Sequence, residues 1–394
     1  MTTSSFDFYT NVAVCRDKVL LRGIRDGVRV EERIPFRPTL FLESKSGETK
    51  YTSLDGKYLE PVKPGSIPEC RDFCKQYRDV GGFNIYGNTD YVYQYIGESY
   101  RGDIDYDLSM VSVAYIDIET ESEYGFPKVE ESKERVNAIS MDVGDTLYVF
   151  GLGDFHIEGA DKQYNCETEE ELLFKFIEVW KEERPDIITG WNVRFFDIPY
   201  LVNRIGIVLG SDAAKSLSPW GLVKEKTVKR MSREQQCYEI IGVSTLDYYE
   251  LYQTFTYVNQ ESYRLDHIAF VELGEKKLSY DEYDSITSFY KRNFQKFMEY
   301  NVKDTLLIKK LEDKMKLLEL AVSLAYSAKV NYMDVFGQVR TWDCIIYHYL
   351  MDHNVVIPPK SPGRKDTQYA GAYVKEPIVG MHDWVVSFDL NSLY

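Results

Sequence analysis

The sequence predicts a mixed α/β protein, and three patterns carry that prediction. A mostly apolar run at 111–120 is typical of a central strand that is buried on both faces. Two further strand-like runs, 137–143 and 146–152, are separated by a Gly-Asp turn and predict an antiparallel meander with the first. The apolar residues of 168–185 then recur at helical spacing. Strands followed by alternating helices and strands favour a mixed sheet flanked by helices.

Residues 1–107 come before this pattern and predict a small α+β module. One helix is expected from Glu69 to Val80, and the polar stretch 98–107 is expected to be a linker or an edge loop. Short β-like runs alternate with polar turns at 11–15, 18–24 and 39–44.

The helix predicted within 168–185 has acidic residues in its first turn and Pro185 after its end. A short buried strand is expected at 186–192, and a helix with Asp197 near its start is expected at 195–206. Later segments are predicted as a strand (238–247), a helix (263–273), one or two long helices (285–318), more helix through 354, a proline-rich stretch (356–366) and a β-like end (383–390).

Length and charge limit the function classes. A chain of 394 residues suggests two or three domains, and its net charge of -16 argues against holding nucleic acid by bulk electrostatics. Any DNA contact must therefore be local. Clustered carboxylates that bind divalent cations would permit such a contact, because the cations offset the negative charge near the phosphate. The six cysteines lack paired C-x-x-C spacing and indicate reduced thiols. No leader or long apolar run is present, so we expect a cytosolic protein without a membrane partner.

Carboxylates occur at three places where a folded domain would not keep them without a cation. Asp117 and Glu119 alternate at the end of the apolar strand, so both side chains face one side. Asp197 begins a helix directly after a strand. Tyr300 and Asp304 are spaced i, i+4 on a predicted helix and are neighbours on one face. Converging carboxylates of this kind suit two divalent ions that hydrolyse phosphodiesters, with a tyrosine hydroxyl orienting the water.

Each of these positions also has a purely structural interpretation. Asp197 is a favoured residue type for capping its helix. For Tyr300 and Asp304 taken alone, an exposed polar pair on a helix is the favoured interpretation, because such i, i+4 pairs are common. The order in which all three patterns occur favours the metal site.

These residues carry a resemblance to a known family. The segments YIDIET, ITGWNVRFFDIPY and YNVKD resemble the three exonuclease motifs of family B DNA polymerases, in that order. RPTLF, SPWGLVK, STLDYYELY and TWDCII further resemble the polymerases of T-even-type bacteriophages, so the likeness covers the whole chain.

The resemblance implies a ribonuclease-H-like 3′→5′ proofreading exonuclease at about 108–335 that uses two Mg²⁺ or Mn²⁺ ions. By that likeness Asp117 would hold both ions, Glu119 and Asp304 one of them, and Asp197 the other directly or through water, while Tyr300 would orient the nucleophile. Residues implied to contact DNA are Phe126, whose ring would stack on frayed primer bases, Asn192, Phe196 and Arg233.

Two late motifs extend the resemblance toward a polymerase. YAGAYVKEP resembles the Tyr-x-Gly-Gly junction motif, with Tyr369 and Gly371 implied to contact DNA and an alanine in place of the second glycine. FDLNSLY resembles the start of the first polymerase motif, where Asp389 would bind metal and Tyr394 would exclude ribonucleotides. We therefore expect 369–394 to begin a palm domain, and 336–368 to complete the amino-terminal domain of residues 1–107.

One aspartate cannot build a two-metal site, so no polymerisation is expected from this chain by itself. The sequence would then be an expression fragment, a truncated product or one piece of a split polymerase, with DNA and the remainder of the polymerase as partners. A phage-encoded protein would work in the bacterial host cytoplasm.

The basic stretch 222–236 leaves two interpretations open. It is either a solvated surface loop or, as the resemblance implies, a β-hairpin with Arg233 near its tip that helps to part primer from template.

Two other functions also remain open at this stage. The amino-terminal region of related phage polymerases is associated with RNA binding, so a non-catalytic RNA-binding module is the alternative to an enzyme. A stand-alone nuclease acting on RNA would use the same metal chemistry.

Overall fold

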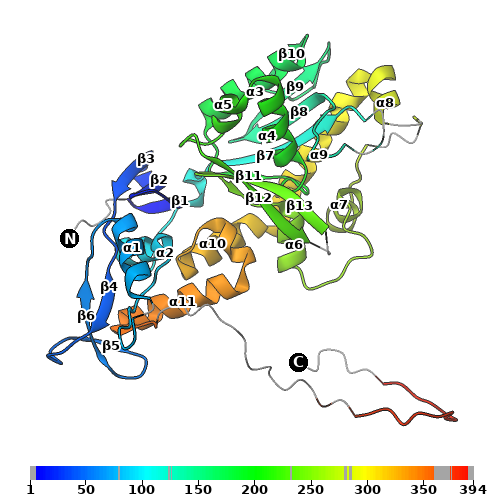
Figure 1. Ribbon diagram of the computed structural model, residues 1–394. Helices are drawn as coiled ribbons and strands as arrows, with labels where there is room; N and C mark the ends of the chain where they lie inside the picture. Colours follow the sequence, from blue (N-terminus) through cyan, green and yellow to red (C-terminus); the bar gives the residue numbers. More distant parts are fainter. Residues whose placement is uncertain are drawn as a thin grey trace. The chain divides into compact units, whose positions relative to one another are not determined.

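The computed structural model of the chain describes residues 6–78, 80–122, 125, 127–230, 233–278, 282–283, 286–358, 373 and 375–388, with only the backbone described at 229, 230 and 233. The chain divides into two compact units, residues 1–359 and 360–394. Helices and strands are found in the first unit (Figure 1). In the described part of the chain, no helix combines the length and the apolar character needed to span a membrane.

The β-like run predicted at 383–390 is wrong over its described residues, which form no strand. Trp384 is 97% exposed and Phe388 is 89% exposed, so no neighbouring strand covers this segment among the described residues. A strand needs hydrogen-bonding partners on at least one edge, and apolar β-prone residues cannot supply them alone. The junction and polymerase residues Tyr369, Gly371, Asp389 and Tyr394 lie outside the described residues.

The amino-terminal module begins with an antiparallel meander of three strands, as the sequence predicts for the first two. Strands β1 (Phe8–Cys15), β2 (Lys18–Arg25) and β3 (Val28–Pro35) pair in order. Sequence reasoning did not find β3, because half of its residues VRVEERIP are charged and none of its side chains is fully buried.

A second amino-terminal sheet has the order β15-β5-β6-β4. Strand β15 (Val355–Val356) pairs in parallel with β5 (Tyr51–Ser53), so the end of the first unit returns to its beginning. The other strands and the helices of this region are β4 (Leu40–Glu43), β6 (Tyr58–Val62), α1 (Ile67–Tyr77), α2 (Tyr91–Ser99), η1 (Leu108–Met110) and α11 (Gln338–Asp352).

The central sheet confirms the mixed α/β prediction. Among the described residues it has six strands in the order β10-β9-β8-β7-β11-β14. β7, β8 and β9 form the predicted antiparallel meander, whereas β10 is parallel to β9 and both β11 and β14 continue in parallel with β7. The strands are β7 (Val113–Thr120), β8 (Val136–Val143), β9 (Thr146–Leu152), β10 (Lys162–Cys166), β11 (Ile187–Thr189) and β14 (Ser244–Thr245).

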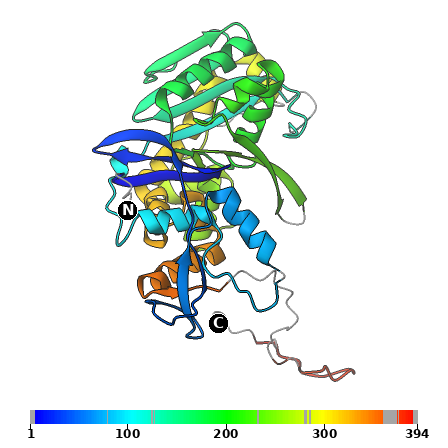
Figure 2. The same ribbon diagram turned by 60° about the vertical axis from the view of Figure 1, so that its left-hand side comes forward.

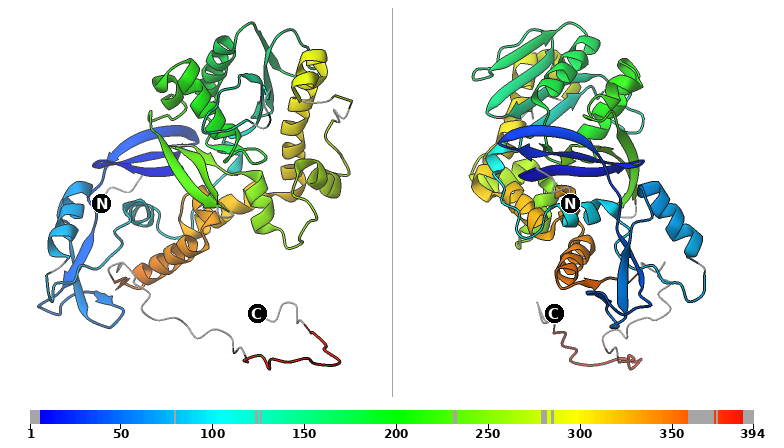
Figure 3. Two further views of the ribbon diagram at one scale, coloured as in Figure 1. Left: turned by 45° about the vertical axis from the view of Figure 1, so that its right-hand side comes forward. Right: turned by 90° about the vertical axis from the view of Figure 1, so that its left-hand side faces the viewer.

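Helices cover both faces of this sheet (Figure 3). On one face, α3 (Glu169–Glu183) and α4 (Asp197–Val208) enclose a core of β7, β8 and β11 side chains, and α5 (Ser211–Lys215) follows α4. On the other face, α9 (Phe294–Met315) packs against β7 and β8. Strand β7 therefore lies between two helical layers.

Helix α3 has the features from which the sequence predicts a helix at 168–185. The Thr168 hydroxyl accepts a hydrogen bond from the N–H of Glu171, and the first turn carries three glutamates that favour the positive end of the helix dipole. Its apolar residues, among them Leu172, Phe176 and Trp180, are buried against the sheet.

The single strand predicted at 238–247 is wrong, because two strands share this segment. Strand β13 (Arg233–Ile240) ends before Gly242, which adopts φ 97°, and β14 follows at Ser244. A side chain at Gly242 would also meet Pro219 at 2.6 Å, so the chain turns sharply here.

The basic stretch forms the antiparallel hairpin of β12 (Val223–Arg230) and β13, so the predicted hairpin is confirmed as a structure, whereas its role in parting primer from template stays a prediction. It projects from the first unit as a two-stranded arm (Figure 2). Arg233 pairs with Arg230 across the turn, which places its backbone near the tip.

The long helical stretch after residue 285 divides into three helices. These are α8 (Ile286–Arg292), α9 and α10 (Leu317–Ala328). Lys316, at φ 56°, separates α9 from α10, and the left-handed Lys329 ends α10 before α11 resumes the helix. The remaining helices are α6 (Tyr248–Phe255), α7 (Leu265–Leu273) and η2 (Tyr332–Phe336).

Candidate active site

Strand β7 presents two carboxylates on one face of the central sheet. Ile116 and Ile118 are buried in the core toward α3 and α4, whereas Asp117 and Glu119 alternate with them and are half-buried. Asp117 pairs with Ser140 of β8, and the Ser140 hydroxyl donates to a main-chain carbonyl of α9. The two carboxylates therefore face α9.

Helix α9 supplies Tyr300 and Asp304 one turn apart. Both are buried, Tyr300 with 7% and Asp304 with 2% of its surface exposed, so the interpretation as an exposed polar pair is wrong. The Oδ1 atom of Asp304 is buried without a hydrogen-bond partner among the described atoms. Burying an unpaired carboxylate oxygen is unfavourable, and a bound cation would satisfy it.

The structure brings three of the predicted carboxylates together. One oxygen from each of Asp117, Glu119 and Asp304 lies within 4.8 Å of the other two. These residues form the acidic cluster. Carboxylate oxygens are the ligands that Mg²⁺ and Mn²⁺ prefer, so the donor set fits a hard divalent cation.

Asp197 reaches the same strand from the opposite helical layer. It is the first residue of α4, and its Oδ1 accepts a hydrogen bond of 3.1 Å from the N–H of Ile118. Phe196 occupies the N-cap position, so the interpretation of Asp197 as the cap of its helix is wrong. Its carboxylate lies beside the main chain that joins Asp117 to Glu119.

The electrostatics of the cluster require a compensating positive charge. Burial, followed by the charges of Asp304 and Asp197, raises the pKa of Asp117 well above its usual value. Burial likewise raises the pKa of Glu119 to about 8, of Asp197 to about 7 and of Asp304 to about 6. The three carboxylates of the acidic cluster, with Asp197 nearby, repel one another when ionised unless cations lie among them.

Lys277 supplies one such charge, and sequence reasoning did not find it. Its ammonium forms an ion pair with Asp304 Oδ2 and lies 4.8 Å from the centre of the Tyr300 ring. Burial opposes the charge, but the carboxylates of Asp304 and Asp117 outweigh burial and raise the pKa of Lys277. Lys277 follows α7 in the polar segment GEKKL, where nothing in the sequence distinguishes it from a solvated lysine.

Asn301 also contacts the cluster and was not predicted. Its Nδ2 atom donates to Asp117 Oδ2 at 2.7 Å and to the main-chain oxygen of Asp117 at 3.1 Å. The only signal was its place inside the YNVKD motif, between the two residues that were predicted.

The loop between β11 and α4 holds Asn192 and Phe196. A Cβ atom on Gly190 would lie 2.5 Å from the carbonyl oxygen of Ile116, so only glycine allows this approach to β7. Asn192 adopts a left-handed φ of 64°, and its N–H donates to the buried carboxylate of Asp247 at 3.0 Å. Asp247, which was not predicted either, thus fixes the loop that leads into Asp197.

The other residues predicted to contact DNA are less fully described. Phe126 lies outside the described residues, and only the backbone of Arg233 is described. Phe196 packs against Tyr200, with ring centroids 5.6 Å apart.

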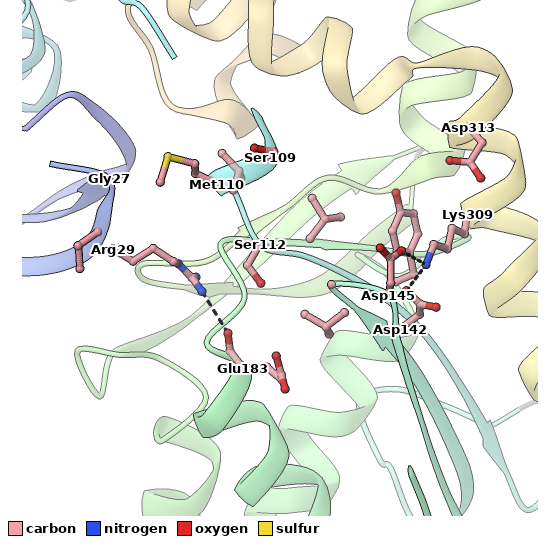
Figure 4. Close-up of a pocket in the computed structure, with 16 residues that line it drawn as sticks. Gly27, Arg29, Ser109, Met110, Ser112, Asp142, Asp145, Glu183, Lys309 and Asp313 are labelled. Carbon is pink, nitrogen blue, oxygen red and sulfur yellow. Dashed lines mark hydrogen bonds and ion pairs between the residues drawn. The ribbon is translucent and has the colours of Figure 1, made fainter. Parts of the chain in front are cut away.

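An open cavity of about 800 Å³ lies apart from this site, where the β2–β3 turn approaches the start of β7 (Figure 4). None of the predicted site residues lines it. Lys309 donates to Asp142 at 2.7 Å and to Asp145 at 3.0 Å, and Arg29 pairs with Asp186 at 2.8 Å. Both cations among the described lining residues, Arg29 and Lys309, are thus already paired with carboxylates.

Comparison with known proteins decides the family. Residues 92–268 match the family model for the DNA polymerase family B exonuclease domain. The chain therefore carries a family B DNA polymerase exonuclease domain. The matched segment contains Asp117, Glu119 and Asp197, whereas α9 with Tyr300 and Asp304 lies beyond it.

Two phage proteins extend the likeness along the chain. The DNA-directed DNA polymerase of Escherichia phage RB69 is 32% identical over 98% of this chain and 46% of its own length. The DNA-directed DNA polymerase of Enterobacteria phage T4 is 31% identical with the same coverage. The DNA polymerase catalytic subunit of Psittacid herpesvirus 1 is 28% identical over 69% of this chain. The chain spans just under half the length of the two phage relatives.

Proposed function

We propose that this chain is the 3′→5′ proofreading exonuclease portion of a replicative DNA polymerase and removes 3′-terminal nucleotides from single-stranded or frayed DNA. The observation that carries the proposal is the convergence of Asp117 and Glu119, which lie in the segment matched by the family B exonuclease model, with Asp304 of α9 within 4.8 Å. The unpartnered, buried Asp304 Oδ1 supports a cation at that place.

Divalent ions bound here, Mg²⁺ or Mn²⁺, would activate water and stabilise the leaving oxygen of the phosphodiester. In this proposal Asp117 would hold two ions, Glu119 and Asp304 would hold one of them, and Asp197 would hold the other directly or through water. Burial, together with Asp304, raises the pKa of Tyr300, so its hydroxyl stays protonated and can orient the attacking water.

The strand order of the central sheet supports a ribonuclease-H-like exonuclease domain at 108–335, next to an amino-terminal domain of 1–107 completed by 336–368. We assign DNA contacts to Phe126, Asn192, Phe196 and Arg233 of the exonuclease region, and to Tyr369 and Gly371 of the junction.

We further propose that 369–394 begins the palm, with Asp389 and Tyr394 as parts of a polymerase site that other residues complete. The site of action would be the bacterial host cytoplasm, with the remainder of the polymerase as partner.

The geometry does not favour the alternative of a non-catalytic RNA-binding module. A cluster of carboxylates repels the phosphates of RNA and of DNA alike unless a cation lies between them. A protein that only binds RNA would therefore gain no affinity from this cluster.

The test is hydrolysis of a 5′-labelled single-stranded DNA oligonucleotide in Mg²⁺ or Mn²⁺. The unaltered chain should produce a ladder shortened from the 3′ end, and D117A/E119A should lower the rate at least about a thousandfold. Asp145→Asn is a control for the loss of a carboxylate away from the cluster, because it removes an exposed carboxylate from the turn between β8 and β9 and should leave the rate unchanged. Equal rates for the double variant and the parent would overturn the assignment, and an RNA oligonucleotide degraded as fast as DNA would argue against proofreading.

A further inference from the structure

Asn301 makes two hydrogen bonds to a single residue of the acidic cluster. Its Nδ2 atom donates to the side chain of Asp117 at 2.7 Å and to the main-chain oxygen of Asp117 at 3.1 Å. Asn301 itself has no exposed surface. The amide therefore holds both the carboxylate and the backbone of Asp117.

The chemistry of the contact defines the orientation of the amide. Both atoms that face Nδ2 are oxygens that accept hydrogen bonds, so turning the amide over would place Oδ1 against them. In the observed orientation Oδ1 is buried and has no partner among the described atoms. The two hydrogen bonds that Nδ2 donates to Asp117 offset the free-energy cost of leaving Oδ1 unpaired, so the contact is specific and not incidental packing.

The contact leaves Asp117 suited to bind a cation. Nδ2 engages Oδ2 of Asp117, fixes the plane of the carboxylate and leaves the other oxygen, Oδ1, without a bond to Asn301. A neutral donor also does this without adding positive charge that would compete with a metal ion. Lys277, by contrast, places its charge on Asp304.

We propose that Asn301 is a positioning residue that holds the Asp117 carboxylate in the orientation that binds the divalent ion. This inference rests on the proposed exonuclease function and adds to it a residue outside the expected ligand set. Hydrogen-bonding partners of metal ligands typically change metal affinity or activity by about 10- to 100-fold when they are removed.

The matched control lies one turn further along the same helix. Thr305 has no exposed surface, and its hydroxyl forms a 2.7 Å hydrogen bond with the Ser140 hydroxyl of β8. Thr305→Val thus removes a buried hydrogen bond between α9 and the sheet without touching a carboxylate of the cluster.

The test measures Mn²⁺ binding by electron paramagnetic resonance of the free ion, alongside hydrolysis of single-stranded DNA as a function of Mn²⁺ concentration. Asn301→Leu, which keeps the side-chain volume and removes the donor, should weaken Mn²⁺ binding about tenfold or more. Thr305→Val should bind Mn²⁺ as the parent does. Asn301→Ala provides the same comparison if leucine prevents folding, which thermal unfolding would reveal.

Mn²⁺ binding by both Asn301 variants within twofold of a parent that does bind would overturn this inference alone. A parent chain that binds no Mn²⁺ would overturn the proposed function and the inference together.

Discussion

The carboxylate of Asp197 accepts a hydrogen bond of 3.1 Å from the main-chain N–H of Ile118. Ile118 separates Asp117 from Glu119 on β7, so this bond connects the start of α4 to the strand that carries both acidic residues. Because Asp197 is 96% buried, with 4% of its surface exposed, the bond is protected from water.

Two substitutions of Asp197 test the contributions of its charge and of its hydrogen bond separately. Asp197→Asn and Asp197→Ala both remove the charge, and both should lower hydrolysis of single-stranded DNA by at least about a hundredfold. Only asparagine keeps an oxygen that can accept from Ile118, so alanine should reduce the free energy of unfolding by about 1 kcal/mol more than asparagine. Denaturant unfolding measures this difference. Equal free energies of unfolding for the two variants would show that the hydrogen bond between Asp197 and Ile118 does not stabilise the contact of α4 with β7.

The ion pair of Lys277 with Asp304 predicts a stability that depends on metal. Lys277→Met keeps the aliphatic stem but leaves the buried Asp304 carboxylate without its cation, which should cost about 2 kcal/mol in the absence of metal. Added Mn²⁺ should restore most of that loss, because the ion supplies the missing positive charge. Thermal unfolding with and without Mn²⁺ measures both effects.

Lys303→Met is the control for this experiment. Lys303 pairs with Glu275 through partly exposed side chains, so its removal should change stability by less than about 1 kcal/mol whether or not metal is present. A loss in Lys277→Met that Mn²⁺ does not reduce would contradict the prediction.

Sequence patterns predicted β7, β8, β9 and β11 of the central sheet because burial dictates their periodicity, whereas β10, whose residues KQYNC are mostly polar, was not predicted. The apolar alternation around Asp117 and Glu119 places both on one face of β7, and the i, i+4 spacing places Tyr300 beside Asp304 on α9. Both relations join residues that are close together in the sequence, so the sequence pattern is sufficient to predict them.

The residues that complete the site could not be predicted in this way. Lys277, Asn301 and Asp247 acquire their roles from contacts between segments far apart in the chain, such as the 184 residues between Asp117 and Asn301. A lysine or an asparagine is commonly exposed, and no periodicity marks one that is buried against a carboxylate. Strand β3 was missed for a related reason, since half of its residues are charged and none of its side chains is fully buried.

The approach of Gly190 to Ile116 predicts a steric effect on the site. In Gly190→Ala the new methyl group would lie 2.5 Å from a main-chain oxygen of β7, so the strand or the loop must move. We expect a loss of about 1–3 kcal/mol in the free energy of unfolding and a clear drop in DNA hydrolysis, because the loop leads into Asp197.

Gly206→Ala is the matched control. Gly206 lies in α4, and a Cβ atom there would meet nothing within 4 Å. The substitution should stabilise the protein by about 0.5–1 kcal/mol through helix propensity and leave hydrolysis unchanged. Denaturant unfolding of both variants is the measurement, and a Gly190→Ala protein as stable and active as the parent would contradict the prediction.

His348 predicts how stability of the first unit depends on acid. It is buried on α11, and burial, followed by the charge of Lys329, lowers the pKa of its imidazole to about 4. Its folded pKa is below the unfolded value of about 6.5, so the neutral ring stabilises the fold fully above pH 6.5. That contribution should decline as the pH falls toward 4, by up to about 3 kcal/mol in total. The expected result is a free energy of unfolding that falls more steeply between pH 6.5 and 4 in the parent than in His348→Asn, which cannot bind the proton. Parallel pH profiles for the two proteins would show that the imidazole is not the group that becomes charged on unfolding in acid.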